Sequence, residues 1–320
     1  MSSSARVIFF GTPACAAPYL RVIRDAGNDL VAVVTQPDKP KGRSKQLCPS
    51  PVKAAAQAEG LCVLQPDSCR DPQFIGQLRS LEPDVLLIVA YGKILCPNLL
   101  AVPRVATLNV HYSLLPAFRG AAPVQRALLA GLTETGVTLQ HVSEELDAGD
   151  IVAQATLTIA EEDNTESLLA RLTDLGAALV RAQLAAVLAG TAARTPQDPG
   201  QATLAPRLTK QDGLLNLEES ALSLSNRVRA VTPWPGAAVC LRGQRLLIRQ
   251  ARPVSSPLPA TPGQILALDP QHGPLIATGD GALQLLAVQP LGKKAMSGAE
   301  YLRGARLTMA DRFQSGQDCC

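Results

Sequence analysis

Asn109 and His111 occupy alternate positions in the segment TLNVHYS (107–113), which otherwise has the apolar character of a buried strand. Because successive side chains of a strand point to opposite faces, the amide and the imidazole project from the same face. The strand pattern ends at the turn SLLP (113–116), and Gly120 follows soon after. An amide N–H can donate to an oxygen that becomes negative, and a neutral imidazole can accept a proton. The pair could therefore serve a reaction at a carbonyl group.

A carboxylate that could complete this pair is Asp147, in the acidic loop EELDAGD (144–150). The loop follows another strand pattern, GVTLQHV (136–142), and loops at the carboxyl ends of strands converge in α/β sheets. There Asp147 could orient the imidazole or stabilise its charged form. No serine or cysteine is placed as a covalent nucleophile, so the three residues predict direct transfer of an acyl-type group to a bound nucleophile.

Each of the three residues also has a structural interpretation that the sequence leaves open. A strand histidine is often hydrogen-bonded inside a core, a buried asparagine can satisfy backbone groups, and an aspartate before Ala-Gly can form a turn. A metal site is not expected, because His111, His141 and His272 lie far apart and no HxxxH or Cys/His grouping occurs.

The elements that must position these residues alternate between strand and helix patterns. Such alternation predicts an N-terminal doubly wound, Rossmann-like parallel sheet in an α/β domain. The expected strands are 6–11, 30–36, 85–92, 107–113 and 136–142, and the expected helices lie around 14–26, 50–59, 71–81, 121–131 and 165–188.

The sequence after the last expected helix is rich in Gly, Pro, Thr and Gln, which predicts a linker over 190–206. Short apolar segments punctuated by Gly and Pro follow, as is typical of a small β-barrel or sandwich. We therefore expect a catalytic domain at 1–189 and a β-barrel domain at 207–320. The latter holds 13 Lys and Arg against 8 Asp and Glu, a net charge of +5 that suits either a polyanionic partner or a solvated surface.

The composition places the chain among globular proteins, because 47% of its 320 residues are hydrophobic. No run of about 18 apolar residues occurs, so no membrane span is expected. Pro13 interrupts the first apolar stretch too early for a secretory signal. The eight cysteines form no CxxC pair and predict reduced thiols in a cytoplasmic protein.

The segment TQPDKPKGRSKQLCPSPVK (35–53) is an unusually basic loop. Beside the single acid Asp38 it carries five basic residues, Lys39, Lys41, Arg43, Lys45 and Lys53. Its four prolines and one glycine predict neither a helix nor a strand. At the site-bearing edge of the sheet such a loop could close over a phosphate-rich partner, although a solvated loop can have the same composition.

The segment FFGTP (9–13) after the first expected strand has a single glycine. It therefore lacks the GxGxxG fingerprint of dinucleotide binding, and an NAD-dependent oxidoreductase is not expected. Thr12-Pro13 instead predicts the start of a helix.

Several segments occur together in the order typical of one family. They are FFGTP, TQPDKPKGR, VAYGKIL, LNVHYSLLPAFRGAAPVQRALLAG, TGVTLQHVSEELDAGDIV, TPWPGA and QPLGKK followed by YLRG. Through them nearly the whole chain resembles the methionyl-tRNA formyltransferase family of 10-formyltetrahydrofolate-dependent enzymes. The resemblance implies transfer of a formyl group from 10-formyltetrahydrofolate to the α-amino group of methionyl-initiator tRNA, for translation initiation.

The resemblance also implies roles for particular residues. Asn109, His111 and Asp147 match the catalytic residues of the family. The implied tetrahydrofolate-binding residues are Ser113, Leu114, Leu115 and Pro116, with the main chain around Val89, Tyr91 and Gly92. The implied tRNA contacts are Lys39, Lys41, Arg43 and Lys45 in the basic loop and Lys210, Arg229, Lys293 and Lys294 in a C-terminal domain that resembles an OB-fold. No metal is implied.

Two other functions stay open on the sequence. Another 10-formyltetrahydrofolate-dependent transferase or hydrolase, acting on a small amine substrate, would share the catalytic residues and the SLLP turn. The basic loop and the C-terminal domain favour tRNA over such a substrate. A non-enzymatic nucleic-acid-binding protein would not need Asn109, His111 and Asp147 in one pocket. Nothing in the sequence demands more than a monomer.

Overall fold

The structure is a computed structural model that describes residues 4–41, 46–255 and 260–318. The chain forms two compact units. Unit 1 comprises Met1–Pro123, Glu134–Thr158 and Leu169–Ala205, and unit 2 comprises Val124–Thr133, Ile159–Leu168 and Pro206–Cys320. Within the described ranges, no helix has the length and apolarity needed to cross a membrane.

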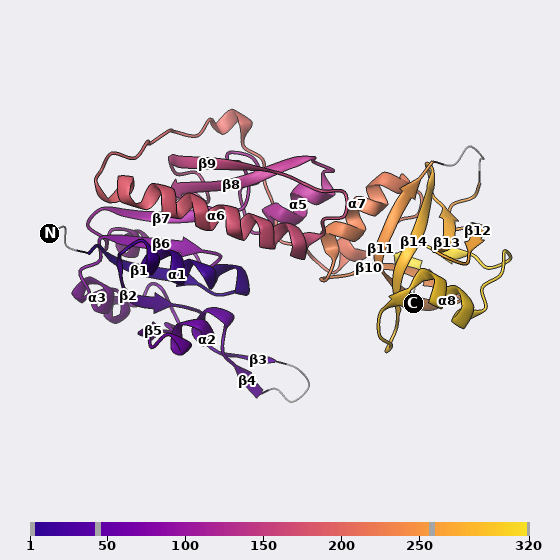
Figure 1. Cartoon of the computed structure of the whole chain (residues 1–320), viewed down its shortest axis with the longest axis horizontal. Helices are drawn as coiled ribbons and strands as arrows, with labels where there is room; N and C mark the ends of the chain where they lie inside the picture. The colour runs from indigo at the N-terminus through magenta and orange to yellow at the C-terminus, as the bar shows by residue number, and fades with distance from the viewer. Residues whose placement is uncertain (1–3, 42–45, 256–259, 319–320) are drawn as a thin grey trace. The chain divides into compact units, whose positions relative to one another are not determined.

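Unit 1 contains a mostly parallel sheet whose described strands have the order β5-β2-β1-β6-β7-β8-β9 (Figure 1). The pairing is parallel from β5 to β7, whereas β8 and β9 are each antiparallel to the strand before them. The chain order reverses between β1 and β6, a position where α/β sheets place their ligands. The bounds are β1 Arg6–Gly11, β2 Asp29–Val34, β5 Val63–Leu64, β6 Val85–Val89, β7 Ala106–His111, β8 Glu134–His141 and β9 Ile151–Thr158.

The helices that follow the strands are α1 Pro18–Asp25, α2 Pro51–Ala58, α3 Pro72–Ser80, α4 Pro97–Leu100, α5 Pro123–Leu129 and α6 Thr165–Leu188. A short 3-10 turn, Ala14–Ala16, precedes α1. The first four of these helices have proline in their first turn, where the missing N–H costs no hydrogen bond and the fixed φ suits a helix. The start of each of these four helices therefore coincides with a proline in the sequence.

Helices cover both faces of the sheet in unit 1. On one face Ile8 and Phe10 of β1 belong to a buried cluster with Phe74 and Leu78 of α3. On the other face the Tyr19 hydroxyl of α1 donates to the Thr173 carbonyl of α6 at 3.4 Å. Because the central strands β1 and β6 bury side chains in two layers, their sequences are apolar on both faces, as expected for a doubly wound sheet.

The predicted strands and helices of the N-terminal part are present, with shifts at their ends. The prediction missed β5 and β9. β9 has few buried side chains, since its burial alternates along an edge of the sheet. An edge strand of mixed polarity gives a weak signal in a sequence.

The basic loop contains a short hairpin, so the prediction of no strand in it is wrong. β3 (Lys39–Lys41) pairs antiparallel with β4 (Gln46–Cys48). Pro40 fits because the described part of this ribbon has only two strands, so one edge of β3 needs no N–H donor. Residues 42–45 lie outside the described residues.

Unit 2 is organised around an antiparallel sheet in the order β12-β13-β14-β11-β10-β16, with β15 beside β14. Irregular pairing in β11 and β12 adds bends, and the sheet curls into an OB-like half-barrel around a core of Leu, Val and Ile side chains (Figure 1). Helix α7 was not predicted and contributes Leu224 and Val228 to this core. The bounds are α7 Ala221–Val231, β10 Ala237–Leu241, β11 Gln244–Val254, β12 Ile265–Asp269, β13 Gly273–Ala277, β14 Ala282–Pro290, β15 Met296–Ser297, α8 Gly298–Ala305 and β16 Phe313–Gln314.

Candidate active site

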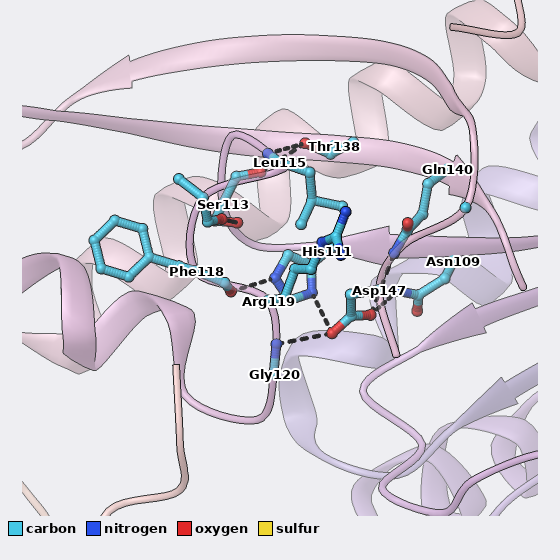
Figure 2. A network of polar contacts seen from close by, with 12 residues as sticks. Asn109, His111, Ser113, Leu115, Phe118, Arg119, Gly120, Thr138, Gln140 and Asp147 are labelled. Carbon is cyan, nitrogen blue, oxygen red and sulfur yellow. Dashed lines mark hydrogen bonds and ion pairs between the residues drawn. The ribbon is translucent and has the colours of Figure 1, made fainter. Parts of the chain in front are cut away.

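Asn109 and His111 lie at the carboxyl end of β7, and the loop between β8 and β9 brings Asp147 to them (Figure 2). Asn109 Nδ2 is 3.5 Å from Asp147 Oδ1, and His111 Nδ1 is 3.6 Å from Asp147 Oδ2. The His111 and Asp147 side chains are only 7% and 12% exposed, so water screens their interaction weakly. The structure thus brings together the three residues that the sequence singled out.

The orientation of the His111 ring follows from its second nitrogen. Nε2 lies 2.9 Å from the carbonyl oxygen of Phe118, which can only accept, so Nε2 carries a hydrogen and donates it. Phe118 has a φ of 61°, in the left-handed region, and this turns its carbonyl toward the ring. Nδ1 is consequently the nitrogen that faces Asp147 and can gain or lose a proton.

Asp147 is surrounded by hydrogen-bond donors. Its Oδ2 accepts the Gly120 N–H at 2.9 Å, and its Oδ1 accepts the Gln140 amide at 3.2 Å. Together with the Asn109 amide, three N–H groups converge on the two oxygens, and His111 Nδ1 lies 3.6 Å from Oδ2. An ionised carboxylate accepts without donating, so it matches this environment better than an amide of the same size.

The backbone around Asp147 depends on a glycine two residues later. Asp147 itself has a φ of 52°, a conformation that L-residues seldom adopt. A Cβ at Gly149 would overlap the main-chain carbonyl of His141. The Gly149 position therefore allows the loop to lie close against the end of β8, and this holds Asp147 at the site.

We expect Gly149→Ala to lower the free energy of unfolding by about 1–3 kcal/mol, because the added methyl group displaces the loop that carries Asp147. The same displacement should remove most catalytic activity. Gly76→Ala is the matched control, since a Cβ there meets no atom within 4 Å in the middle of α3. Urea unfolding and kcat should separate the two variants. Equal stability of Gly149→Ala and the parent protein would contradict the packing argument.

The predicted folate-binding turn is fixed to β8 by one threonine. Thr138 Oγ1 donates to the Ser113 carbonyl at 2.7 Å and accepts the Leu115 N–H at 3.0 Å (Figure 2). Ser113 and Leu115 are buried, whereas Leu114 and Pro116 are partly exposed. The turn is thus a rigid feature beside His111, with accessible atoms at Leu114 and Pro116.

The second predicted folate-binding stretch lies at the end of β6. Val89 and the Tyr91 side chain are buried, and the Tyr91 ring meets Phe10 edge-on at 5.3 Å between centroids. Ala90 and Gly92 are exposed, and both have left-handed backbone conformations. These two residues are therefore the accessible part of this stretch.

Burial keeps the nearby thiol and phenol groups uncharged. It raises the pKa of the Cys15 thiol and of the Tyr112 phenol, and their side chains lie against each other. A protonated thiol is a poor nucleophile.

The basic residues predicted to contact tRNA fall into three groups. Lys39, in β3, is exposed and donates to the Gln36 side chain, and Lys41 belongs to the same strand. Arg43 and Lys45 lie outside the described residues. In unit 2, Lys210, Lys293 and Lys294 are exposed.

Arg229, the remaining predicted tRNA contact, is partly buried and hydrogen-bonded to other groups of unit 2. Its guanidinium donates to the carbonyl groups of Ala160 and Asp163, each at 3.2 Å, and to Asn226 Oδ1 at 2.6 Å. Burial lowers its pKa. These bonds favour a structural role for Arg229.

The sequence analysis missed several polar residues of the site. Thr138 and Gln140 are buried at alternate positions of β8, a pattern that could have revealed them. Arg119 is also buried, at 6% exposure, and it stands beside the glycine that binds Asp147. Gln197 is far along the chain and gave no local signal. Among the described residues, no group of three or more His, Cys, Asp or Glu side chains is arranged to hold a metal ion.

Two family models match the chain. A formyl transferase model matches residues 5–184, and a model of the formyl transferase C-terminal domain matches residues 207–306. The methionyl-tRNA formyltransferase of Solibacter usitatus (strain Ellin6076) is 43% identical over 97% of this chain and 99% of its own length. That of Bacillus subtilis (strain 168) is 39% identical over 96% of each chain.

Solved structures share the fold at lower identity. HypX from Aquifex aeolicus in complex with tetrahydrofolic acid aligns with a TM-score of 0.64 and 20% identity, over 94% of this chain and 47% of its own. An N-formyltransferase from Helicobacter canadensis, in complex with folinic acid and dTDP-3-aminofucose, aligns with a TM-score of 0.67 and 15% identity, over 89% and 99% of the two chains.

Proposed function

Because this chain belongs to the methionyl-tRNA formyltransferase family, we propose that it catalyses formyl transfer through Asn109, His111 and Asp147. The enzyme transfers the formyl group of 10-formyltetrahydrofolate to the α-amino group of methionyl-initiator tRNA, for translation initiation. The observation that carries this function is the 43% identity to such an enzyme over 97% of the chain. The residue roles rest on the convergence of the three side chains.

Asn109 and His111 stabilise the charge that develops on the formyl oxygen. When the amine attacks the formyl carbon, that oxygen becomes negative, and fixed N–H donors lower the energy of this state. The Asn109 amide makes only a long contact of 3.5 Å with Asp147, so it is available to a second acceptor. His111 Nδ1 becomes a donor once it is protonated, beside Asp147 Oδ2.

His111 also moves the proton that the reaction must transfer. The attacking nitrogen loses a proton as its bond to the formyl carbon forms, and the folate nitrogen gains one as its bond to that carbon breaks. Nδ1 can accept the first proton and supply the second, and Asp147 stabilises the imidazolium between the two steps. The protein ends the cycle in its starting protonation state.

The tetrahydrofolate co-substrate supplies the activated formyl group and is held at the carboxyl edge of the sheet. The accessible residues there are Leu114 and Pro116 of the SLLP turn, together with Ala90 and Gly92. Ser113 and Leu115 act from inside the turn by fixing its shape through Thr138. This arrangement supports binding of a flat polar ring between the two stretches.

Catalysis and tRNA binding are assigned to different domains of the chain. Residues 1–189 form the catalytic domain, 190–206 connect it to the next domain, and 207–320 form the tRNA-binding β-barrel domain. The ranges of the two matching family models support this division. The exposed Lys210, Lys293 and Lys294 provide charge for contacts with phosphates.

The base of the β3–β4 hairpin is held by an ion pair. Lys53 Nζ lies 2.7 Å from Asp38 Oδ2, and Gln65 Nε2 donates to Asp38 Oδ1 at 2.8 Å. These two partners hold the pKa of the Asp38 carboxyl below its usual value. The hairpin that presents Lys39 is thereby anchored to the sheet for contact with the tRNA acceptor stem.

We expect Arg43→Ala, and more strongly Lys39→Ala with Arg43→Ala, to raise KM for tRNA several-fold while kcat and the folate KM stay unchanged. Each lost phosphate contact should reduce the slope of log KM against log salt by about one. Arg181→Ala, which removes an exposed arginine from α6, is the control. An unchanged tRNA KM in the double variant would place recognition outside the hairpin.

The direct test of function is a transfer assay with labelled 10-formyltetrahydrofolate. Methionyl-initiator tRNA, uncharged tRNA, free methionine and buffer alone form its four arms. Label that appears only on charged tRNA supports the function. Folate consumption without formyl-tRNA would instead favour another 10-formyltetrahydrofolate-dependent transferase or hydrolase acting on a small amine.

The enzyme acts as a monomer in the cytoplasm. The proposed site is built from one chain, because Asn109, His111 and Asp147 come from a single unit. The two substrates of translation initiation are found in the same compartment as the ribosome. The molecular mass from sedimentation of the purified protein tests whether it is a monomer.

A further inference from the structure

Gln197 lies in the segment between the two matched family models and is bonded to the loop that carries Asp147. Its Nε2 donates to the main-chain carbonyls of Asp147 at 2.9 Å and Gly149 at 2.8 Å. The Gln140 Oε1 lies 3.2 Å from the same nitrogen. One amide group thus binds the backbone on both sides of Ala148, and it also reaches the side chain that donates to Asp147.

Arg119 fixes the orientation of this amide. Its Nε and Nη2 donate to Gln197 Oε1 at 3.1 Å and 2.8 Å, so the oxygen must face the guanidinium and the nitrogen must face the loop. Arg119 is 6% exposed, and its Nη1 lies 3.3 Å from Glu145 Oε1, in the same loop. The amide is therefore held by a charged group that is itself fixed.

Arg119 also lies between the two main-chain groups that hold the proposed catalytic pair. The preceding residue, Phe118, accepts from His111 Nε2, and the following residue, Gly120, donates to Asp147 Oδ2 (Figure 2). The segment that carries Gln197 runs along this stretch, since the Arg119 N–H donates to the Thr203 carbonyl at 2.8 Å. Displacing Gln197 would therefore detach the Asp147 loop from residues 118–120, which also orient the His111 ring.

We propose that Gln197, oriented by Arg119, is a positioning residue for formyl transfer that fixes Asp147 relative to His111. The inference rests on the proposed roles of His111 and Asp147. Gln197 touches no substrate in this scheme, so its effect falls on kcat and leaves substrate binding intact. The segment 190–206 then contributes to the catalytic site as well as connecting two domains.

The first test is Gln197→Ala. Small displacements of a catalytic group can cost about 100-fold in rate, and we expect kcat to fall by about 10-fold to 100-fold. The KM values for tRNA and 10-formyltetrahydrofolate should stay within about threefold, because neither binding surface includes Gln197. Gln201→Ala, in the same segment with an exposed side chain bonded to Asp198, is the control and should match the parent protein.

Gln197→Glu tests whether Gln197 acts by anchoring the segment 190–206 or by positioning the loop that carries Asp147. The carboxylate still accepts from Arg119, so the segment stays in place, but it cannot donate to the two carbonyl groups. We expect kcat to fall as in Gln197→Ala, with an unchanged melting temperature. A Gln197→Glu enzyme with the kcat of the parent protein would overturn the proposal.

A double-mutant cycle with Asp147→Asn tests whether Gln197 acts through Asp147. In single-turnover assays, Gln197→Ala should change the residual rate of Asp147→Asn by less than about twofold. The same 10-fold to 100-fold loss in both backgrounds would overturn the proposal, because it would show an effect independent of Asp147. If the proposed function itself is wrong, the parent protein will not formylate methionyl-initiator tRNA, and this outcome is distinct from those of the variants.

Discussion

Replacing His111 with alanine is expected to lower kcat for formyl transfer by about 10³-fold, because the variant loses both an oxyanion donor and the group that moves the proton. The KM for tRNA should change little, since His111 is not among the basic residues proposed to contact tRNA. Single-turnover transfer to methionyl-initiator tRNA measures the loss. A rate within tenfold of the parent enzyme would remove His111 from the mechanism.

Two further variants test whether the loss of activity comes from misfolding. His111→Gln keeps an N–H that can donate to the Phe118 carbonyl, but it cannot carry a proton, so it should be nearly as inactive as the alanine variant. His141→Gln removes another histidine of unit 1 that has no proposed role, and it should retain the parent rate. Melting temperatures of all variants show whether the fold is preserved.

Replacing Asp147 with asparagine is expected to lower kcat by about 10²-fold to 10³-fold. The amide has nearly the same shape, but with its oxygen toward Gly120 it presents a donor where Gln140 and Asn109 require an acceptor. It also removes the negative charge that stabilises the imidazolium of His111. The loss therefore combines two lost hydrogen bonds with a weaker acid–base group.

The control for this change is Asp174→Asn, which removes one negative charge from an exposed position of α6. Because Gly120 can still donate to the asparagine Oδ1, most of the local fold should persist. A folate analogue should therefore still raise the melting temperature of Asp147→Asn. Parent-like transfer by Asp147→Asn would assign the loop a structural role only.

The sequence alone predicted the central strands and most helices of unit 1, and the pairing of Asn109 with His111. Both predictions depend on local periodicity, because a strand repeats its faces every two residues and a helix repeats its faces about every 3.6 residues. Family motifs then indicated the reaction, since they record residue types at fixed spacings. Weakly apolar edge strands such as β9 and the proline-containing β3 escaped the same reasoning.

What periodicity could not predict is which distant residues complete the site. Gln197 is 50 residues from Asp147 and 78 from Arg119 along the chain, so only the folded path of 190–206 brings these side chains together. Arg229 is a similar case, because only the fold shows that its guanidinium donates to the carbonyl groups of Ala160 and Asp163. A sequence determines which side chains share a strand face or a turn, since those relations are local. Hydrogen-bond partners far apart in sequence are decided by tertiary packing, because each depends on where two separately folded segments meet.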